Sequence, residues 1–531
     1  MSKKRFSWIV LMAIAVLLAA CAAPKTMEVE KVVEKIVTAT PKTEPPRELV
    51  VAVPEEPPHL FWGDWSGMLN APAAANVYET LTERDATGNV VPGLAVSWAQ
   101  VSDLEWVFQL REGVRFHDGT EFDAEDAAWS INYQADPENN MLSFWVLEGM
   151  RAEVAALDDH MLKVITAKPE PILPRLLTFI AIPPPEWALT QAALDGQEMV
   201  GTGPYKFVEW DKGQSIILEA NPDYWGGEPE VKRVKFVWRP ESAVRAAMLR
   251  VGEADIAAWL APQDGGPVPT QSVDIAETPF LYFDPNGPLA DLRVRKAVCY
   301  TVDKEALSRI FLGYASPAAE LVTSDVLGYN PKIEVIPQDF EWATMLLAEA
   351  KADGVDVDAT ITLYGRKGIY PNATEVMEAV LNWMRKAGFN VELQMLEVGA
   401  WREVNLAIPV PKDRVSVIQS SHGNEVGDAS YTLRAYYGPY GPDTWYKYDD
   451  MGGGRRPVTD PNMVDLIEAA LPLTEAGGRE AALQSALAYH NERVMWACPM
   501  VHIQDLWGVS LDVDWTPRFD RRILVKEVGW R

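Results

Sequence analysis

Residues 106–126 read WVFQLREGVRFHDGTEFDAED, and this stretch says most about the fold. Its first six residues alternate apolar and polar side chains, which predicts a strand with one buried face. Glu112-Gly113 supplies a turn, and the alternation resumes over residues 114–116. We therefore expect a hairpin at this point.

A second turn, His117-Asp118-Gly119, leads into the start of a helix. A carboxylate beside an imidazole is half of a common catalytic arrangement. Adjacent residues of a turn point in different directions, however, so we expect a structural role for this pair. Asp123 is predicted to cap the following helix, and Asp126 completes the capping-box spacing.

Further along, residues 360–364, 374–387 and 390–396 read as strand, helix and strand, with Gly388 ending the helix. This order predicts a parallel strand pair joined by a right-handed crossover, and hence an α/β fold. The remaining patterns predict strands at residues 48–53, 216–219, 234–238 and 280–284, and helices at residues 70–81, 241–251, 292–311 with a break at Asp303, and 479–495.

The N-terminus carries the pattern of an export signal. Three basic residues at 3–5 precede an apolar stretch over residues 6–20, which is short for a membrane span. The stretch ends in Leu18-Ala19-Ala20-Cys21, the pattern of a bacterial lipobox, so we expect residues 1–21 to be a lipoprotein signal peptide with its lipobox and Cys21 to become the lipidated N-terminus of the mature protein. An ordinary signal peptide with an incidental cysteine is the alternative. Residues 22–47 are rich in Lys, Glu, Thr and Pro and are predicted to be a tether.

Composition excludes several classes of protein. A chain of 531 residues with 48% hydrophobic residues can bury cores in more than one lobe. The net charge of −28 opposes binding to nucleic acid. The six histidines lack the spacing of a zinc site, and nucleophile-elbow and phosphate-loop motifs are absent, so we expect no metal, no cofactor and no catalytic residue. Paired carboxylates for glycoside hydrolysis have no sequence spacing and stay open.

Two further cysteines, Cys299 and Cys498, each lie in an apolar pattern. Exported thiols can pair, but free cysteine is also among the most buried residue types. We expect unpaired, buried thiols, with pairing left as the alternative.

Several segments together resemble the family 5 extracellular solute-binding proteins, which serve the dipeptide, oligopeptide and nickel ABC importers. The resemblance covers the chain from about Glu48 to the C-terminus and is most specific over the stretch that contains residues 116–126. The other matching segments are Gly88–Trp98, Val200–Phe207, Asn221–Gly227, Gly252–Ile256 and Asp291–Ala297.

The resemblance implies a two-lobed periplasmic-binding-protein (Venus-flytrap) fold with an extra subdomain in lobe I. Lobe I is expected at residues 48–282 plus 501–531, with the subdomain at about 85–198, and lobe II at residues 283–500. The two crossovers between the lobes are expected near residues 281–286 and 500–505. A hinge of a few residues suits such short segments.

The resemblance further implies a receptor that is not an enzyme and that delivers a peptide-like or other small solute to an ABC permease. Such a receptor is expected to be a monomer, held outside the cytoplasm at the cell membrane by its lipid anchor. An exported, carboxylate-dependent hydrolase of oligosaccharides and a lipoprotein sensor or chaperone on the same scaffold are the alternatives.

Site residues are expected in loops at strand ends that carry groups unusual for a plain turn. Asp428 is a candidate partner for a cationic solute group, and capping of the next helix is its alternative role. The loop at residues 420–431 departs from the acidic loop of peptide binders, which leaves the solute open. The predicted binding residues are Trp62, Trp65, Tyr78, Thr202, Gly203, Trp401, His422, Asn424, Glu425 and Asp428. Packing in the core is the alternative role of Trp62, Trp65 and Tyr78.

Overall fold

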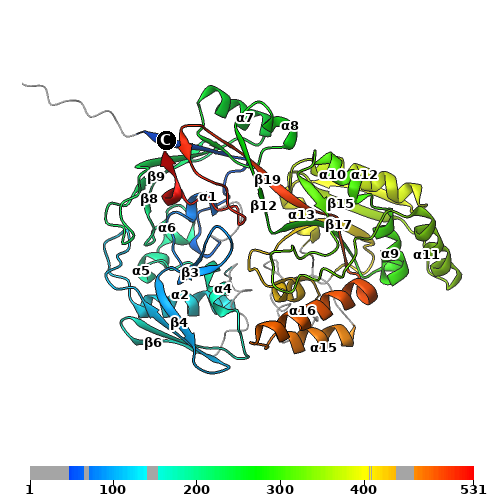
Figure 1. Ribbon diagram of the computed structural model, residues 1–531, viewed down its shortest axis with the longest axis horizontal. Helices are drawn as coiled ribbons and strands as arrows, with labels where there is room; N and C mark the ends of the chain where they lie inside the picture. The colour runs from blue at the N-terminus through cyan, green and yellow to red at the C-terminus, as the bar shows by residue number, and fades with distance from the viewer. Residues whose placement is uncertain are drawn as a thin grey trace, which may run out of the picture. The chain divides into compact units, whose positions relative to one another are not determined.

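The computed structural model describes residues 47–64, 71–139, 141, 153–405, 407, 410–437 and 460–531 (Figure 1). All of these residues belong to one compact unit, Pro46–Arg531. The predicted signal peptide, Cys21, the tether up to residue 46 and Trp65 lie outside the described residues. Among the residues that the structure describes, no helix combines the length and apolar composition needed to cross a bilayer.

The first sheet has the strand order β12-β19-β11-β1-β10-β9-β8, with β14 paired to β19. Its centre is β1 (Glu48–Val53), which is parallel to both β10 (Arg233–Trp238) and β11 (Ile256–Ala257). The other strands are β8 (Tyr205–Asp211), β9 (Ser215–Ala220), β12 (Thr270–Asp274), β14 (Ala315–Pro317) and β19 (Val501–Val509). The strands predicted at residues 48–53, 216–219 and 234–238 are confirmed.

The second sheet has the order β16-β15-β17-β13-β18. β15 (Ile361–Arg366) pairs in parallel with β16 (Val391–Leu396), and α12 (Ala373–Lys386) connects them, so the predicted crossover is confirmed. Helix α12 buries one face against the sheet through residues at helical spacing, such as Val376 and Val380. The other strands are β13 (Glu277–Phe283), β17 (Ser416–Gly423) and β18 (Ala497–Pro499).

Apart from β14, which lies between β13 and β15 in the chain and pairs with β19 of the first sheet, the chain changes sheets at two places. β12 ends in the first sheet at Asp274 and β13 begins in the second at Glu277, so the first crossover is Ile275–Ala276. The chain returns at Met500, between β18 and β19. The first crossover was expected at residues 281–286, but residues 281–283 lie inside β13, where Leu281 and Tyr282 pair with both β17 and β18 and Phe283 pairs with β17.

A separate sheet, β4-β5-β7-β6, packs with α2 (Ala124–Ala135). Its strands are β4 (Ala95–Gln100), β5 (Glu105–Leu110), β6 (Glu153–Asp158) and β7 (Met161–Ile165). The capping box of Asp123 and Asp126 is confirmed. The hairpin predicted across Glu112-Gly113 is wrong, because β4 and β7 already occupy both edges of β5 and residues 114–116 form no strand.

The helix predicted at residues 70–81 is also wrong. Only α1 (Ala71–Ala74) forms, and β2 (Thr82–Arg84) follows. Tertiary hydrogen bonds replace the helix: the Asn76 side chain donates to the Ile523 carbonyl and accepts from the Val525 amide. The carbonyl oxygens of Asn76 and Val77 accept hydrogen bonds from the amides of residues 205 and 203.

The long helical pattern at residues 292–311 divides as predicted into α9 (Leu292–Thr301) and α10 (Lys304–Ile310), because Asp303 caps α10.

The other helices are α4 (Leu173–Leu176), α5 (Pro185–Ala188), α6 (Gln191–Leu194), α7 (Ser242–Val251), α8 (Pro262–Gly265), α11 (Phe340–Ala352), α13 (Val398–Asn405), α14 (Ala429–Thr432), α15 (Pro461–Ala470) and α16 (Ala476–Tyr489). Short 3-10 or π segments are η1 (Trp62–Asp64), η2 (Pro137–Asn139), η4 (Leu177–Phe179), η5 (Gly287–Ala290), η6 (Leu433–Tyr437), η8 (His490–Val494) and η9 (Val525–Glu527). The remaining strands are β3 (Val90–Pro92), β20 (Val513–Asp514) and β21 (Gly529–Trp530).

Cys299 and Cys498 are free and fully buried, as predicted. Their side chains are hydrogen-bonded to each other in the core that covers the second sheet. Each thiol therefore serves as a small apolar core group.

Glu320 gives the fold a testable dependence on pH. Its side chain is buried and accepts a hydrogen bond of 2.7 Å from the Asn330 amide, and burial raises its pKa to about 8. The folded chain then keeps a proton that the unfolded chain, with the ordinary pKa of 4.5, has lost. We expect the contribution of Glu320 to the free energy of unfolding to fall as the pH rises from about 4.5 to about 8, and Glu320→Gln to remove that contribution from the pH dependence. Urea denaturation across this range measures it, with Glu349→Gln on the exposed face of α11 as the control. An unchanged slope in Glu320→Gln would contradict the assignment.

Candidate functional site

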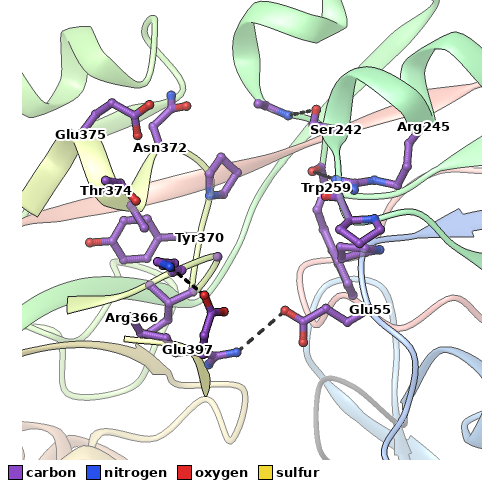
Figure 2. Close-up of a pocket in the computed structure, with 18 of the residues that line it drawn as sticks. Glu55, Ser242, Arg245, Trp259, Arg366, Tyr370, Asn372, Thr374, Glu375 and Glu397 are labelled. Atoms are coloured by element: carbon purple, nitrogen blue, oxygen red, sulfur yellow. Dashed lines mark hydrogen bonds and ion pairs between the residues drawn. The ribbon is translucent and has the colours of Figure 1, made fainter. Parts of the chain in front are cut away.

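A cavity of about 470 Å³ lies between the two sheets (Figure 2). Segments from both sheets contribute to its wall. The lining residues are Pro54, Glu55, Pro240, Ser242, Arg245, Trp259, Ala261, Arg366, Lys367, Gly368, Ile369, Tyr370, Pro371, Asn372, Ala373, Thr374, Glu375, Glu397 and Arg521.

The lining follows the carboxyl ends of parallel strands. Glu55 comes just after β1, Pro240 after β10, Trp259 after β11, and Arg366 is the last residue of β15. In open α/β sheets the carboxyl ends of the strands are where ligands bind, because the loops there are free to vary while the sheet holds them in place. Topology therefore marks this cavity as the candidate site.

On the side of the first sheet, Arg245 fixes the wall. Its guanidinium group donates to the backbone carbonyls of residues 239, 240, 258 and 259 at 2.6–2.9 Å. Burial lowers its pKa to about 10, which leaves it charged at neutral pH. Because these carbonyls use its donors, Arg245 shapes the cavity, and Glu55 is a carboxylate that this side presents to it.

On the side of the second sheet, α12 begins at the cavity. Its N-cap residue, Asn372, makes no side-chain capping bond; its amide group binds the Ile310 carbonyl instead. The first helical residues, Ala373 to Glu375, line the cavity. An uncapped helix N-terminus carries partial positive charge and favours an anionic group.

Arg366 faces Glu55 across the cavity (Figure 2). The shortest distance between the guanidinium group and the carboxylate is 4.0 Å, and the buried Nε of Arg366 has no partner among the described residues. Lys367 lies beside Arg366 and pairs with Glu397 at 2.7 Å. Burial lowers the pKa of Arg366, so a closer anion would stabilise its charge. The cavity thus offers a carboxylate on one wall and a loosely paired cation on the other.

Residues with strained backbone conformations also line this cavity. Of the five described residues other than glycine with positive φ, three line the cavity: Trp259 at 48°, Asn372 at 60° and Arg521 at 60°. Such conformations cost energy and concentrate at ligand sites, where the surrounding structure enforces them. This observation is independent of the cavity's position in the fold.

Arg521 also joins the two sheets. It forms ion pairs with Glu277, the first residue of β13, and with Asp505 of β19, the strand that follows the second crossover. Its distances to the Asp505 carboxylate are 2.5 and 2.7 Å. One side chain therefore contacts the cavity and both strands that leave the crossovers.

The residues predicted from lobe I lie away from this cavity. Trp62 is fully buried against Trp129 and Tyr133, and its ring N–H donates to the Ala188 carbonyl. Tyr78 is buried in the same core. Because both side chains pack in the core, neither Trp62 nor Tyr78 is exposed for the predicted binding role.

Thr202 and Gly203 are likewise committed within the fold. The Thr202 hydroxyl donates to Glu79, and a side chain at Gly203 would meet the carbonyls of residues 76 and 77. His117, from the turn in the opening stretch, shares a hydrogen bond with the Gly203 carbonyl at 2.8 Å. The turn is thus a structural junction, and the structural role expected for His117 is confirmed.

Of the residues predicted from the second lobe, Trp401 contacts a residue that lines the cavity: its ring lies 5.6 Å from the Arg366 guanidinium, and its N–H donates to the Gln419 carbonyl. His422 and Asn424 are buried and share Thr432 as a hydrogen-bond partner. Burial lowers the pKa of His422 to about 3, so it is neutral.

Asp428 takes the alternative role of a helix cap. It caps α14 through the Ser430 amide, and both of its oxygens bind Arg479 at 2.9 and 3.0 Å. Burial works to raise the pKa of Asp428, but the Arg479 guanidinium holds it below its usual range. The charge expected to meet a cationic solute is therefore neutralised inside the protein. Glu425, from the same loop, presents its backbone carbonyl to Arg84 of the opposite lobe.

Sequence reasoning missed Glu55, Trp259, Arg366 and Asn372. A usable signal existed for Arg366 and Asn372, because both lie between the predicted strand at residues 360–364 and the predicted helix at residues 374–387 of the parallel unit. The site prediction relied on unusual loop composition instead, and this criterion selected aromatic residues that are buried. In the described part of the chain, no three His, Cys, Asp or Glu residues are grouped so that they could hold a metal ion.

Comparison with known proteins agrees with this architecture. The family model for bacterial extracellular solute-binding proteins, family 5 Middle, matches residues 89–443. The Dipeptide-binding protein of Escherichia coli strain K12 is 28% identical over 380 residues, 65% of this chain and 70% of that protein. Di/tripeptide-binding protein 2 of Pseudomonas aeruginosa strain UCBPP-PA14 is 26% identical over 457 residues, 78% of this chain and 82% of that protein.

Among solved structures, the dipeptide binding protein from Pseudoalteromonas sp. SM9913 in complex with Met-Leu has a TM-score of 0.78 at 19% identity, and covers 91% of this chain and 100% of its own. This likeness shows the two-lobed α/β fold. Since the family model spans more than half of the chain, the chain belongs to the bacterial extracellular solute-binding proteins of family 5.

Proposed function

We propose that this solute-binding protein captures a short peptide, or a solute with the same pair of charged ends, in the cavity between its two sheets. The observation that carries the proposal is Glu55 facing Arg366 across the cavity at 4.0 Å. A zwitterion can replace this loose pair with two close contacts: its ammonium group to Glu55, and its carboxylate to Arg366 and the start of α12. The names of the two peptide-binding relatives support this class of solute.

The proposed lobes follow the two sheets, except that β14, which pairs with β19 of the first sheet, lies in the chain segment of lobe II. Lobe I comprises residues 48–274 and 501–531, including the subdomain around α2, and lobe II comprises residues 277–499. The crossovers at Ile275–Ala276 and Met500 are then the hinge. The expected boundary at residues 282/283 moves to the first crossover, since β13 belongs entirely to the second sheet.

The family consists of binding proteins of transporters, and we propose that this chain delivers its solute unchanged to an ABC permease. We also propose that it acts as a monomer held at the outer side of the membrane by a lipid on Cys21. Labelling of the wild type, but not of Cys21→Ala, by a radioactive fatty acid reports this anchor.

The test of the proposed function is a screen of dipeptides and tripeptides for thermal stabilisation of the purified protein. A peptide that binds only the folded state stabilises it by about 2.7 kcal/mol at a hundredfold excess over Kd. Peptides blocked at both ends should fail, because they lack the charges that Glu55 and Arg366 recognise. Stabilisation by blocked peptides alone, or by neutral sugars alone, would contradict the proposal.

Arg366→Gln is expected to weaken binding of a stabilising peptide by about 1.5–3 kcal/mol, since it removes a charge-assisted hydrogen bond to the carboxylate. Isothermal titration measures the loss. Arg309→Gln, at the exposed end of α10, is the matched control and should bind like the wild type. Equal affinity of the two variants would remove Arg366 from the site.

A further inference from the structure

The loop Asn424–Gly427 of lobe II inserts one side chain, Val426, into lobe I. Val426 is fully buried, and its side chain belongs to the apolar cluster that contains Leu81, Leu94 and Phe179 of lobe I. A valine from one lobe therefore completes the core of the other. Separation of the lobes would expose this side chain to water, at a cost that scales with its apolar area.

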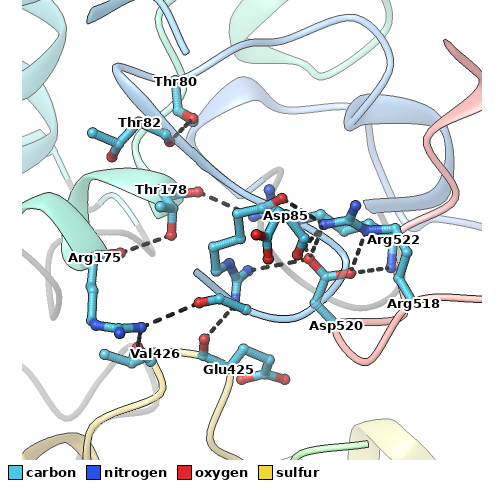
Figure 3. A network of polar contacts seen from close by, with 12 residues as sticks. Thr80, Thr82, Asp85, Arg175, Thr178, Glu425, Val426, Arg518, Asp520 and Arg522 are labelled. Atoms are coloured by element: carbon cyan, nitrogen blue, oxygen red, sulfur yellow. Dashed lines mark hydrogen bonds and ion pairs between the residues drawn. The ribbon is translucent and has the colours of Figure 1, made fainter. Parts of the chain in front are cut away.

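Two arginines of lobe I bind the backbone of the same loop. Arg84 donates to the Glu425 carbonyl at 2.5 Å, and Arg175 donates to the Val426 carbonyl at 3.3 Å (Figure 3). Gly427 has a φ of 72°, and a Cβ there would lie 2.8 Å from the Arg175 guanidinium. The loop backbone is thus shaped for close approach to these cations.

Arg84 is itself held firmly in lobe I. Its guanidinium group lies 4.8 Å from the centre of the Phe179 ring and 4.0 Å from the Asp520 carboxylate. Arg518 binds that carboxylate directly at 3.0 Å (Figure 3). The donor that contacts the loop therefore lies between an aromatic ring and a carboxylate of lobe I.

A second contact between the lobes lies nearby. Arg434 of η6 in lobe II pairs with Glu170 of lobe I at 2.8 Å, and both side chains are almost fully buried. Pairs shielded from water in this way are screened little by salt. The docking of lobe II on lobe I thus combines an apolar insertion, backbone hydrogen bonds and an ion pair.

The hinge and lobe II together hold the loop in its docking conformation. The Asn424 amide donates to the Ala276 carbonyl at 2.6 Å, and the Ala429 amide donates to the Leu327 carbonyl at 2.9 Å. The buried pair of Asp428 and Arg479 fixes the end of the loop. Little conformational entropy remains to be lost when the loop meets lobe I.

We infer that residues 424–427 form a latch that stabilises closure of the two lobes without contact to the solute. None of these residues lines the cavity. The latch residues are then positioning residues: they raise the fraction of the protein in the closed form, and the apparent affinity for any solute rises with that fraction. The inference deepens the proposed function, since it assigns part of the affinity to a surface remote from the solute.

Val426→Ala removes two methyl groups from the docked side chain and is expected to shift the closed-to-open ratio of the solute-free protein roughly five- to tenfold toward the open form. Arg434→Gln should shift it in the same direction. Val417→Ala is the matched control, because Val417 is equally buried but lies in β17 within the core of lobe II.

The distance between the lobes is measured by pulsed electron paramagnetic resonance on solute-free protein with nitroxides at Leu157→Cys in lobe I and Leu473→Cys in lobe II. Both positions are exposed, by 51% and 37%, and Cys299 and Cys498 are fully buried. The full chain carries Cys21→Ala, so that only the introduced thiols react. A solute-free sample is obtained by unfolding in denaturant, dialysis and refolding.

The expected result is a short-distance population in the reference protein and in Val417→Ala that diminishes in Val426→Ala and in Arg434→Gln. Identical distance distributions in all four proteins would overturn the inference. Circular dichroism confirms that each variant is folded, and Arg434→Gln supplies the test if Val426→Ala does not fold. Because no solute is present, failure of every peptide to bind would defeat the proposed function and leave this result standing.

Discussion

Asp428→Ala is expected to lower the free energy of unfolding by about 3–5 kcal/mol, the range seen when one partner of a buried ion pair is removed. The guanidinium group of Arg479 would keep its carbonyl and hydroxyl acceptors, but its charge would have no counterion in a site where the side chain is only 3% exposed. Loss of the cap of α14 adds to the cost. Chemical denaturation at pH 7 measures the change.

Asp303→Ala separates the two causes. Asp303 also caps a helix, α10, but its cationic neighbour Arg309 is 3.7 Å away and 71% exposed. We expect this variant to lose about 1 kcal/mol of unfolding free energy, which is the contribution of a helix cap alone. If Asp428→Ala cost no more than Asp303→Ala, the ion pair with Arg479 would contribute nothing and its assigned role would be wrong.

Arg521→Gln is expected to lower the free energy of unfolding by a similar amount, about 3–5 kcal/mol at pH 7. The substitution leaves two buried carboxylates, Glu277 and Asp505, close together without the cation that joins them. Burial already raises the pKa of Glu277, and removal of Arg521 raises it further, so the variant should regain stability as the pH falls and Glu277 takes up a proton.

Urea denaturation of Arg521→Gln at pH 7 and pH 5 measures both the loss and its partial recovery. Arg531→Gln is the control, because Arg531 pairs with Asp514 at 3.0 Å on the surface and such pairs contribute at most about 1 kcal/mol. A deficit in Arg521→Gln that does not depend on pH would show that packing, and not the two carboxylates, accounts for it.

Local signals in the sequence predicted local structure well. The capping box at Asp123, the interruption at Asp303 and the parallel unit β15-α12-β16 all depend on residues close in the chain, and all three are confirmed. The stretch at residues 70–81 has an equally good helical pattern. There the fold was decided by Asn76, whose partners Ile523 and Val525 lie more than 440 positions away.

The candidate site was harder to predict for a physical reason. A polar or aromatic loop residue can contact the solute or can form contacts within the protein, and the sequence does not distinguish these two roles. Asp428 pairs with the buried Arg479, which lies 51 positions later in the chain, and Trp62 packs against Trp129 and Tyr133 of α2. Glu55 and Arg366 look ordinary in sequence, and only the meeting of the two sheets makes them a pair.

The central claim is that the cavity holds one small solute and returns it unchanged. Native mass spectrometry of the gently purified full chain tests this most directly. The account predicts a 1:1 complex that releases, on activation, an intact peptide or similar zwitterion, and whose occupancy falls in Arg366→Gln and not in Arg309→Gln. A bound species that is hydrolysed during incubation, or one that remains at full occupancy in Arg366→Gln, would contradict the account.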